Sequence, residues 1–363
     1  MIPSLETLQW HAFLGRAPLP SALPAAVSPF VQGPILITGA GGSIGSALAL
    51  RLASAGAHII LLESSENSLY DLQQNLAAIS STPDFYLGSV CDRTLLDEIF
   101  FLHRPSLVFH AAADKHVPLI EEQPLAAIAN NVLATETLVA SVQNARVILV
   151  STDKAVTPAS MMGATKRLAE QIVLTSGGTV LRLGNVLASR GSVTELFARQ
   201  IAAGLSLTVT DPAARRYFVT IAEAVELLLA AASVTQAPAL LAPLLPQPHF
   251  IADLARFMAR ALSPDRIPVI EFTHLRPGDK ESEQLWSNSE TPHPATANGL
   301  VSLRSSLPPR SQFQSLLATL HHALRSRDLS TALAALRVLV PDYTPGQTVL
   351  AQCCSVVSKV SNE

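Results

Sequence analysis

Residues 35–45 read Ile35-Leu36-Ile37-Thr38-Gly39-Ala40-Gly41-Gly42-Ser43-Ile44-Gly45, and an alanine- and leucine-rich stretch follows them. The first four residues form an apolar run with the length of a buried parallel strand, and the composition after the glycines favours a helix. Glycines at such a turn let the backbone approach a pyrophosphate, whose charge lies against the N-terminal amides of the helix. The order of strand, glycine turn and helix therefore favours a dinucleotide site over an ordinary glycine loop. The residues expected to bind the dinucleotide here are Thr38, Gly39, Gly42, Ser43, Ile44 and Gly45.

A second apolar run, residues 58–62, ends at Glu63. In the βαβ pattern, an acid at this distance from the glycine turn hydrogen-bonds the ribose hydroxyls of the adenosine. The carboxylate would repel a ribose phosphate, and residues 64–67 contain no lysine or arginine to bind one. Glu63 therefore favours NAD over NADP. The alternative is a solvated acid that caps the following helix.

Strand-like and helical segments alternate along the first half of the chain. The further apolar runs are residues 85–87, 107–110, 147–151 and 180–183, separated by longer alanine- and leucine-rich segments. This rhythm predicts the α/β class, with repeated βαβ units in a doubly wound parallel Rossmann sheet. Ligands of such sheets bind beyond the carboxyl ends of the strands. Ala111, Ala112 and Ala113 follow one of these ends, so we expect them at the cofactor.

The pattern also suggests how the chain is divided. After residue 184 it loosens into shorter segments and proline-rich turns, which is typical of a smaller α/β substrate lobe. Leucines and alanines recur at helical spacing near the C-terminus. The expected parts are an N-terminal arm in 1–33, a NAD-binding Rossmann domain in 34–190 to which part of 215–250 returns, a lobe in 191–290 that mainly binds substrate, and a linker with C-terminal helices in 291–363.

Composition narrows the possible classes. The chain has 363 residues, 48% of them hydrophobic, and a formal net charge of −3, which gives no electrostatic basis for nucleic-acid binding. No apolar stretch reaches the roughly 18 residues of a membrane span, and the first residues lack the order of a signal peptide. We therefore expect a cytoplasmic protein. The three cysteines, Cys91, Cys353 and Cys354, have neither disulfide-framework nor zinc-site spacing.

Residues 151–166 read Ser151-Thr152-Asp153-Lys154-Ala155-Val156-Thr157-Pro158-Ala159-Ser160-Met161-Met162-Gly163-Ala164-Thr165-Lys166. The segment resembles a short-chain dehydrogenase active site, in which a tyrosine base stands four residues before a lysine on one helical face. Met162 occupies the tyrosine position, and a thioether can neither take nor give a proton. Lys166 is retained, so we expect acid and base from Asp153 and Lys154. The alternatives are a surface ion pair for these two residues and a core position for Met162.

Several motifs, in order, carry a wider resemblance. They are residues 38–45, 109–118, 151–166, 182–193, 216–218 and 276–280. In these motifs the chain resembles the extended short-chain dehydrogenases of polysaccharide biosynthesis (CapD-type), whose best-known members are UDP-N-acetylglucosamine 4,6-dehydratases. Larger members carry a membrane-spanning N-terminal half, and this chain resembles a soluble short form. The resemblance implies NAD as cofactor, a UDP-sugar as substrate and a homo-oligomer without a membrane span.

The reaction that the resemblance implies oxidises C4 of the sugar with NAD, eliminates water across C5 and C6, and returns the hydride to C6. The C4 ketone acidifies the C5 proton, so the site needs a base at C5 and an acid at the C6 hydroxyl. Asp153 would protonate the leaving hydroxyl and Lys154 would remove the C5 proton. That step requires a protonated Asp153 and a neutral Lys154. Lys166 would bind the nicotinamide ribose, Thr152 would lie against O4 of the sugar, and Met162 would pack beside the sugar.

The remaining candidates are residues that the resemblance places at the nucleotide or the sugar. Guanidinium groups suit diphosphate oxygens, although either of the two later arginines could instead form a surface ion pair. The substrate-binding candidates are Lys115, Asn185, Arg190, Gly191, Ser192, Arg216 and Arg276, and Asp92 is a further cofactor-binding candidate. Two other activities stay open: a sugar C4-epimerase or simple dehydrogenase on the same fold, and a non-catalytic NAD-binding scaffold. Epimerisation normally relies on the missing tyrosine.

Overall fold

The computed structural model describes residues 5, 7–21, 33–79, 82–234, 236–295, 299–305 and 307–360, with side chains to residue 353. Residues 1–4, 6 and 22–32 of the expected N-terminal arm lie outside the described residues. So do residues 296–298 and 306 of the expected linker and the last three residues of the chain.

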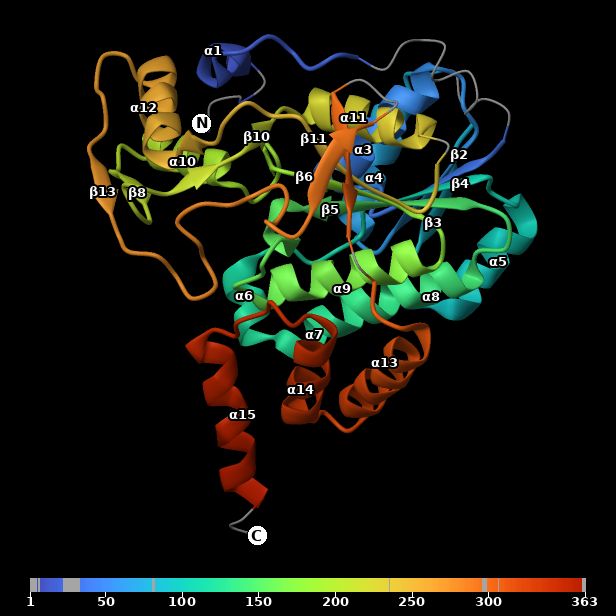
Figure 1. Cartoon of the computed structure of the whole chain (residues 1–363). Helices are drawn as coiled ribbons and strands as arrows, with labels where there is room; N and C mark the ends of the chain where they lie inside the picture. The colour runs from blue at the N-terminus through green and yellow to red at the C-terminus, as the bar shows by residue number, and fades with distance from the viewer. Residues whose placement is uncertain are drawn as a thin grey trace.

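One sheet of nine strands organises the described part of the chain (Figure 1). Its order is β14-β15-β11-β6-β5-β4-β1-β2-β3. Neighbours from β11 to β3 run parallel, whereas β15 and β14 are antiparallel. The order of its first six strands, 3-2-1-4-5-6, is that of a doubly wound Rossmann sheet, so the expected fold class is confirmed. The parallel strands are β1 (Ile35–Thr38), β2 (Ile59–Glu63), β3 (Asp84–Leu87), β4 (Leu107–His110), β5 (Arg146–Thr152), β6 (Thr179–Leu183) and β11 (Ala239–Pro243).

Helices cover both faces of this sheet (Figure 1). Strands β1, β2 and β4 are buried at every residue, as parallel strands covered on both sides require. The helices on one face are α3 (Ser43–Ser54), α4 (Glu66–Leu76) and α11 (Ile221–Ser233), and those on the other are α5 (Arg93–His103), α8 (Ala134–Ser141) and α9 (Met161–Thr175). Between β4 and α8 the chain forms α6 (Val117–Glu122), α7 (Pro124–Ala127) and a π-helical turn, η2 (Ile128–Leu133).

A smaller α/β lobe lies beside the carboxyl ends of the strands and has an apolar cluster of its own. Its helices are α10 (Val193–Ala202) and α12 (Ile251–Leu262), and its paired short strands are β8 (Leu207–Val209) with β13 (Ile270–Phe272), β9 (Arg215–Arg216) with β12 (His249–Phe250), and β7 (Asn185–Val186) with β10 (Phe218–Val219). Helix α1 (Trp10–Leu14) of the N-terminal arm packs into the same cluster. Just after it, Arg16 forms an ion pair with Glu223, 2.5 Å from Nη1 to Oε1, which ties the arm to the start of α11.

The segment expected to be a linker is instead part of the sheet. Strands β14 (Thr291–Pro294) and β15 (Leu300–Arg304) add an antiparallel edge next to β11. The expectation was wrong for these residues because β15 joins the sheet through a non-local pairing with β11, and β14, a short run with two prolines, pairs with β15. The expected C-terminal helices are present as α13 (Arg310–Arg325), α14 (Leu329–Leu339) and α15 (Gln347–Val360), and α13 and α14 pack with α7 and α9 around a third apolar cluster.

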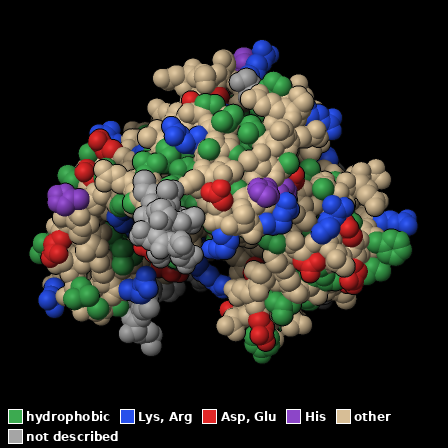
Figure 2. Space-filling view, turned by 90° about the horizontal axis from the view of Figure 1, so that it is seen from below, with side chains coloured by type: hydrophobic (Ala, Val, Ile, Leu, Met, Phe, Trp, Pro, Cys, Tyr) green, Lys and Arg blue, Asp and Glu red, His purple; other side chains and the backbone are tan. Residues whose placement is uncertain are grey.

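Among the described residues, none of the helices combines the length and the hydropathy that a membrane span requires. The face on the side of the C-terminal helices carries lysine and arginine interspersed with aspartate and glutamate, and neither sign of charge dominates among the residues described there (Figure 2).

Candidate active site

The turn between β1 and α3 has the backbone geometry of a pyrophosphate cradle. Gly39 has a φ of +65°, and a Cβ on it would lie 2.6 Å from the amide nitrogen of Ala112. A Cβ on Gly45 would collide with the carbonyl oxygen of Gly39. Both positions therefore require glycine: the first for its dihedral and its contact with β4, the second for close packing of α3 on the turn. Gly42 is the N-cap of α3, so the first-turn amides of Ser43 and Ile44 are available to an anion.

Glu63 lies at the carboxyl end of β2 and is fixed against this turn. Its Oε2 accepts a hydrogen bond from the amide of Gly41 at 2.9 Å, and its Oε1 accepts one from the amide of Ser65 at 2.9 Å. The side-chain cap of α4 is Ser65, which accepts from the amide of Ser68. A carboxylate keeps free lone pairs after accepting two bonds. Glu63 is thus oriented at the glycine turn, where it can accept ribose hydroxyls.

Arg190 and Lys115 also converge on the cofactor turn, although the sequence suggested substrate contacts for both. The amide of Arg190 donates to Oγ of Ser43 at 2.9 Å, and its guanidinium donates to the carbonyl of Gly41 at 3.3 Å. Nζ of Lys115 donates to the carbonyl of Arg190 at 2.6 Å. The turn after β7 therefore lies over the glycine turn, and Arg190 is placed to reach a dinucleotide phosphate.

The carboxyl end of β5 brings together four of the expected site residues. Asp153 is fully buried in the short 3-10 helix η3 (Asp153–Ala155). Its Oδ1 accepts from Oγ1 of Thr152 and from Nζ of Lys154, both at 2.9 Å. Nζ of Lys154 also donates to Oδ1 of Asn185 at 2.8 Å. Among the described residues, Oδ2 of Asp153 has no hydrogen-bond partner although it is buried. An unpaired buried carboxylate oxygen is costly unless a ligand completes it, so this atom marks a position for a polar ligand group.

Lys166 extends from α9 to the same strand end. Its Nζ donates to the carbonyl of Val150 at 2.8 Å. Burial lowers the pKa of Lys166 to about 8, although the negative charge of Glu170 acts to raise it. Nearby, burial and the charge of Lys166 lower the pKa of His110 to about 3. The neutral His110 ring links Thr38 at 2.7 Å to Thr135 at 3.0 Å. This hydrogen bond to His110 fixes the side chain of Thr38, the residue directly before the glycine turn.

Met162 is placed by packing. Its side chain is 5% exposed and belongs to the apolar cluster that α9 shares with the C-terminal helices. The next residue, Gly163, has no room for a Cβ because the carbonyl oxygen of Lys154 lies against it. The start of α9 is thus pressed against η3. The position offers no hydroxyl, and its surroundings suit the core role that was kept open for Met162.

Four further candidates have polar groups that are hydrogen-bonded within the protein. The guanidinium of Arg216 donates to the carbonyls of Arg215, Lys280 and Glu281, so it clamps residues 280–281 and does not lie open to a diphosphate. Asp92 caps α5 by accepting from Leu95. The amide of Gly191 donates to Glu195, and Oγ of Ser192 is hydrogen-bonded to Thr194. Arg276 is different: it is exposed, and its Nε is paired only within its own turn, with Asp279 at 2.9 Å.

Two buried polar residues near the site were missed in the sequence. Asn131, in the π-helical turn η2, holds the backbone of Asp114 through both ends of its amide and donates to Oγ1 of Thr165 at 3.1 Å. Such turns often occur at functional sites, but no simple sequence signal marks them. Glu283 is 3% exposed and paired with Lys280 at 2.5 Å. Burial raises the pKa of Glu283, the charge of Lys154 opposes this rise, and the charge of Asp153 adds to it.

A cavity of about 390 Å³ begins at Gln284, the residue that follows Glu283. Its lining residues are Tyr217, Gln284, Leu285, Trp286, Ser287, Asn288 and Glu290. Burial raises the pKa of Tyr217, and the charge of Asp153 adds to the effect, which links the cavity wall to the end of β5. The volume is within the range of small-ligand pockets, and polar side chains make up most of the wall.

Comparisons with known proteins agree with this fold. The family model for polysaccharide biosynthesis proteins matches residues 35–304. Capsular polysaccharide biosynthesis protein CapD of Staphylococcus aureus is 37% identical over 308 residues, which are 81% of this chain and 51% of that protein. The chain thus spans about half the length of that relative. UDP-glucose 4-epimerase of Rickettsia rickettsii is 35% identical over 280 residues, 72% of this chain and 80% of that protein.

Among solved structures, the fold is similar to that of DesIV, the dTDP-glucose 4,6-dehydratase of Streptomyces venezuelae, crystallised with NAD and TYD bound. The TM-score is 0.63 at 19% identity, and the match covers 69% of this chain and 88% of that one. At this identity the likeness shows a shared fold.

Proposed function

The chain belongs to the polysaccharide biosynthesis protein family, and on that premise we propose that it is an NAD-dependent nucleotide-sugar 4,6-dehydratase. The proposed substrate is UDP-N-acetylglucosamine or a related UDP-hexosamine. The observation that carries the proposal is the pair formed by the buried Asp153 and the partly exposed Lys154, 2.9 Å apart at the end of β5. Helix α9 beside this pair carries Met162 at the position where related enzymes have a tyrosine. Beside a helix position that lacks the usual phenol, this pair supplies the acid and the base that elimination of water needs.

The residues around the glycine turn fit NAD. The glycine cradle, the first-turn amides of α3 and the carboxylate of Glu63 match its pyrophosphate and its adenosine ribose. Lys166, with a pKa of about 8, is charged at neutral pH and can donate to the nicotinamide ribose. When bound, the nicotinamide would take a hydride from C4 of the sugar and return it at C6. Arg190 would contact the dinucleotide, and Arg276 is the more accessible guanidinium for the sugar nucleotide.

The pair can supply the two proton transfers of the elimination. With Lys154 as the neutral amine that this step requires, the proton released from O4 on oxidation passes through the hydroxyl of Thr152 to Asp153, which becomes the carboxylic acid. The amine of Lys154 then takes the C5 proton, and Asp153 gives its proton to the C6 hydroxyl, which leaves as water. Lys154 returns its proton to C5 when C6 is reduced. The site then again holds a neutral Lys154 and an ionised Asp153, and the proton lost from O4 has left as part of the water.

A C4-epimerase is the second candidate, and the Rickettsia relative named for that activity favours it. Epimerisation would invert C4 and leave the C6 hydroxyl in place. Both reactions release a proton from O4 and can pass it through Thr152 to Asp153, but epimerisation does not use an acid at C6 and a base at C5, which the Asp153–Lys154 pair would supply. A homo-oligomer, a cytoplasmic location and the division into domains stay predictions.

Proton NMR of the purified protein with NAD and UDP-N-acetylglucosamine tests the proposal. A dehydratase converts the C6 methylene into a methyl group, which gives a new methyl doublet from a 4-keto-6-deoxy product. An epimerase gives the C4-inverted sugar and no methyl signal. Failure to dehydrate any UDP-hexosamine while NAD is bound would reject the dehydratase and leave the epimerase or the NAD-binding scaffold.

A further inference from the structure

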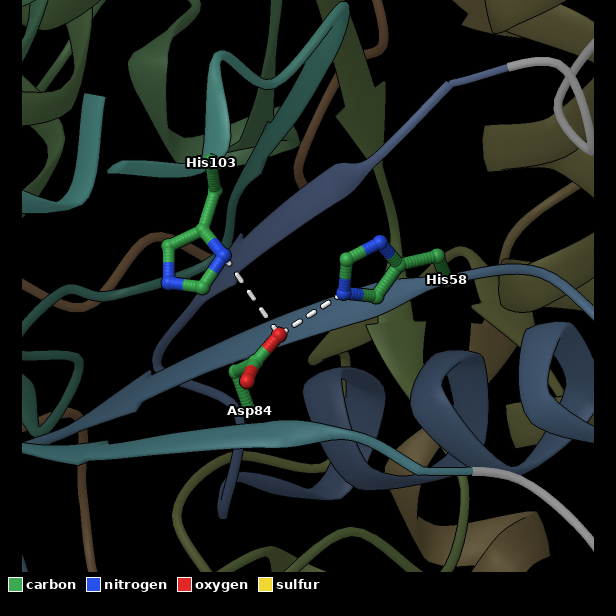
Figure 3. A group of neighbouring side chains, drawn as sticks. All are labelled: His58, Asp84 and His103. Atoms are coloured by element: carbon green, nitrogen blue, oxygen red, sulfur yellow. Dashed lines mark hydrogen bonds and ion pairs between the residues drawn. The ribbon is translucent and has the colours of Figure 1, made fainter. Parts of the chain in front are cut away.

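Three side chains with metal-binding atoms converge at the opposite end of the sheet from the candidate active site. His58 immediately precedes β2, Asp84 is the first residue of β3, and His103 is the last residue of α5. Figure 3 shows both imidazole rings directed at the carboxylate of Asp84, which lies between them. The three residues come from three elements, and the parallel pairing of β2 with β3 fixes two of the elements relative to each other.

The separations of these atoms suit a small divalent ion. Nδ1 of His103 lies 3.5 Å from Oδ2 of Asp84, and Nε2 of His58 lies 2.7 Å from the same oxygen. One ligand atom from each residue can be chosen so that all lie within 4.8 Å of one another. Zinc bonds of about 2.0–2.2 Å place neighbouring ligands of a tetrahedron roughly 3.3–3.5 Å apart. The His103 separation already matches, and rotation of the partly exposed Asp84 carboxylate would widen the His58 separation.

The side chain of Tyr86 lies behind one of the proposed ligands and has the character of an outer-shell group. The hydroxyl of Tyr86, on β3, is 2.6 Å from Nε2 of His103 and so fixes the orientation of the ring that turns Nδ1 toward Asp84. Metal-bound histidines generally use their second nitrogen in this way.

We propose that His58, Asp84 and His103 form a binding site for one divalent zinc-type cation. Two imidazoles and a carboxylate match the ligand preference of zinc, and the exposed side of the group leaves a fourth position for water. The site lies at the amino ends of β2 and β3, whereas the glycine turn and Asp153 lie at carboxyl ends. It is therefore independent of the proposed sugar chemistry, and the cation would join β2, β3 and α5.

Calorimetric titration with zinc chloride tests the site in full-length protein that carries no affinity tag and has been freed of metal with a chelator. The wild-type chain should bind one equivalent at this site. The double variant His58→Gln/His103→Gln should lose that equivalent, and Tyr86→Phe, which keeps all three ligands, should bind about tenfold more weakly. His322→Gln removes an exposed histidine of α13 and serves as the matched control, with unchanged binding expected.

Thermal unfolding provides a second readout that does not depend on activity. Zinc should raise the midpoint of the wild-type chain and of His322→Gln, but not that of the double variant, because only a native site gains from the ion. In the presence of chelator all these proteins should unfold at similar temperatures, which shows that the variants fold. Equal zinc binding by the wild-type chain and the double variant, or no zinc binding by the wild-type chain, would overturn the proposal.

Discussion

Replacement of Arg182 by methionine should destabilise the protein more than any surface charge change. Arg182, on β6, is fully buried and donates to both Glu170 and Glu290, with Nη2 2.9 Å from each carboxylate. Methionine fills a similar volume but leaves two buried carboxylates that share the single cation of Arg167. Removal of one partner from a buried ionic network typically costs about 3–5 kcal/mol. That is a large part of the roughly 5–15 kcal/mol by which domains are stable.

The effect should extend to the candidate site, because the network lies directly behind it. Oγ of Ser151 donates to Oε1 of Glu170 at 2.6 Å, and Ser151 precedes Thr152 and Asp153 in the chain. Glu290 lines the cavity beside these residues. Loss of Arg182 should therefore loosen both the end of β5 and one cavity wall.

Urea unfolding of Arg182→Met and of a matched control, Arg256→Met, measures the difference. Arg256 pairs with Asp253 on the surface, and exposed pairs of this kind contribute less than about 1 kcal/mol. The Arg182 variant should show a much lower midpoint at an unchanged slope. A further exchange of Glu170 for glutamine in that variant should recover part of the loss, since it removes one uncompensated charge. An Arg182→Met loss no larger than that of Arg256→Met would refute the reasoning.

Three further predictions concern the pH dependence of stability, the choice of cofactor and the protonation of Glu283. Burial alone would raise the pKa of Glu290, but hydrogen bonds and charge from Arg182 lower it to about 2. The ionised Glu290 therefore stabilises the folded chain above its unfolded pKa near 4.5, and this contribution should be lost between pH 4.5 and 2. Acid unfolding of the wild type should show the loss, and the stability of Glu290→Gln should depend less on pH over this range. Glu63→Ala should weaken NADH binding about tenfold or more in a fluorescence titration, because a charge-assisted contact with the ribose is lost. NADPH binding should be maintained or improved, because the carboxylate no longer repels the ribose phosphate. An unchanged preference for NADH over NADPH would contradict the role of Glu63 at the ribose. Burial favours the protonated carboxyl of Glu283, and glutamine mimics this form. Glu283→Gln should therefore retain more turnover at neutral pH than Glu283→Ala. The reverse order would contradict a protonated Glu283 in the site.

The features that could be predicted from the sequence are local ones. The glycine turn, the acid after β2 and the alternation of strands with helices each depend on residues that are close in the chain, and the structure has the fold they predict. The Asp153–Lys154 pair could also be predicted, because the end of β5 alone brings its members together. Asn185, which the resemblance placed at the nucleotide, contacts Lys154 from β7, and this contact was not predicted.

The features that could not be predicted depend on contacts between distant segments. Arg190 meets Gly41 across 149 positions, so its place above the cofactor turn is set by how the lobe packs on the sheet. Arg216 is likewise committed to the carbonyls of Lys280 and Glu281, which a motif alone does not show. Strand β15 pairs with the edge of β11, which is distant in the chain, and β14 pairs with β15 although its two prolines give it weak strand character.

The most direct test of the central claim is solvent deuterium at C5. Wild-type protein and Lys154→Ala are incubated with NAD and UDP-N-acetylglucosamine in deuterated water, and the products are examined by proton NMR. The account predicts that the wild type forms the 4-keto-6-deoxy sugar with deuterium at C5, and that the variant, although it still binds NAD, forms neither the methyl group nor the deuterated carbon. Dehydration and C5 exchange that persist in Lys154→Ala would contradict the role assigned to Lys154. A C4-inverted sugar with its C6 hydroxyl intact would contradict dehydration itself.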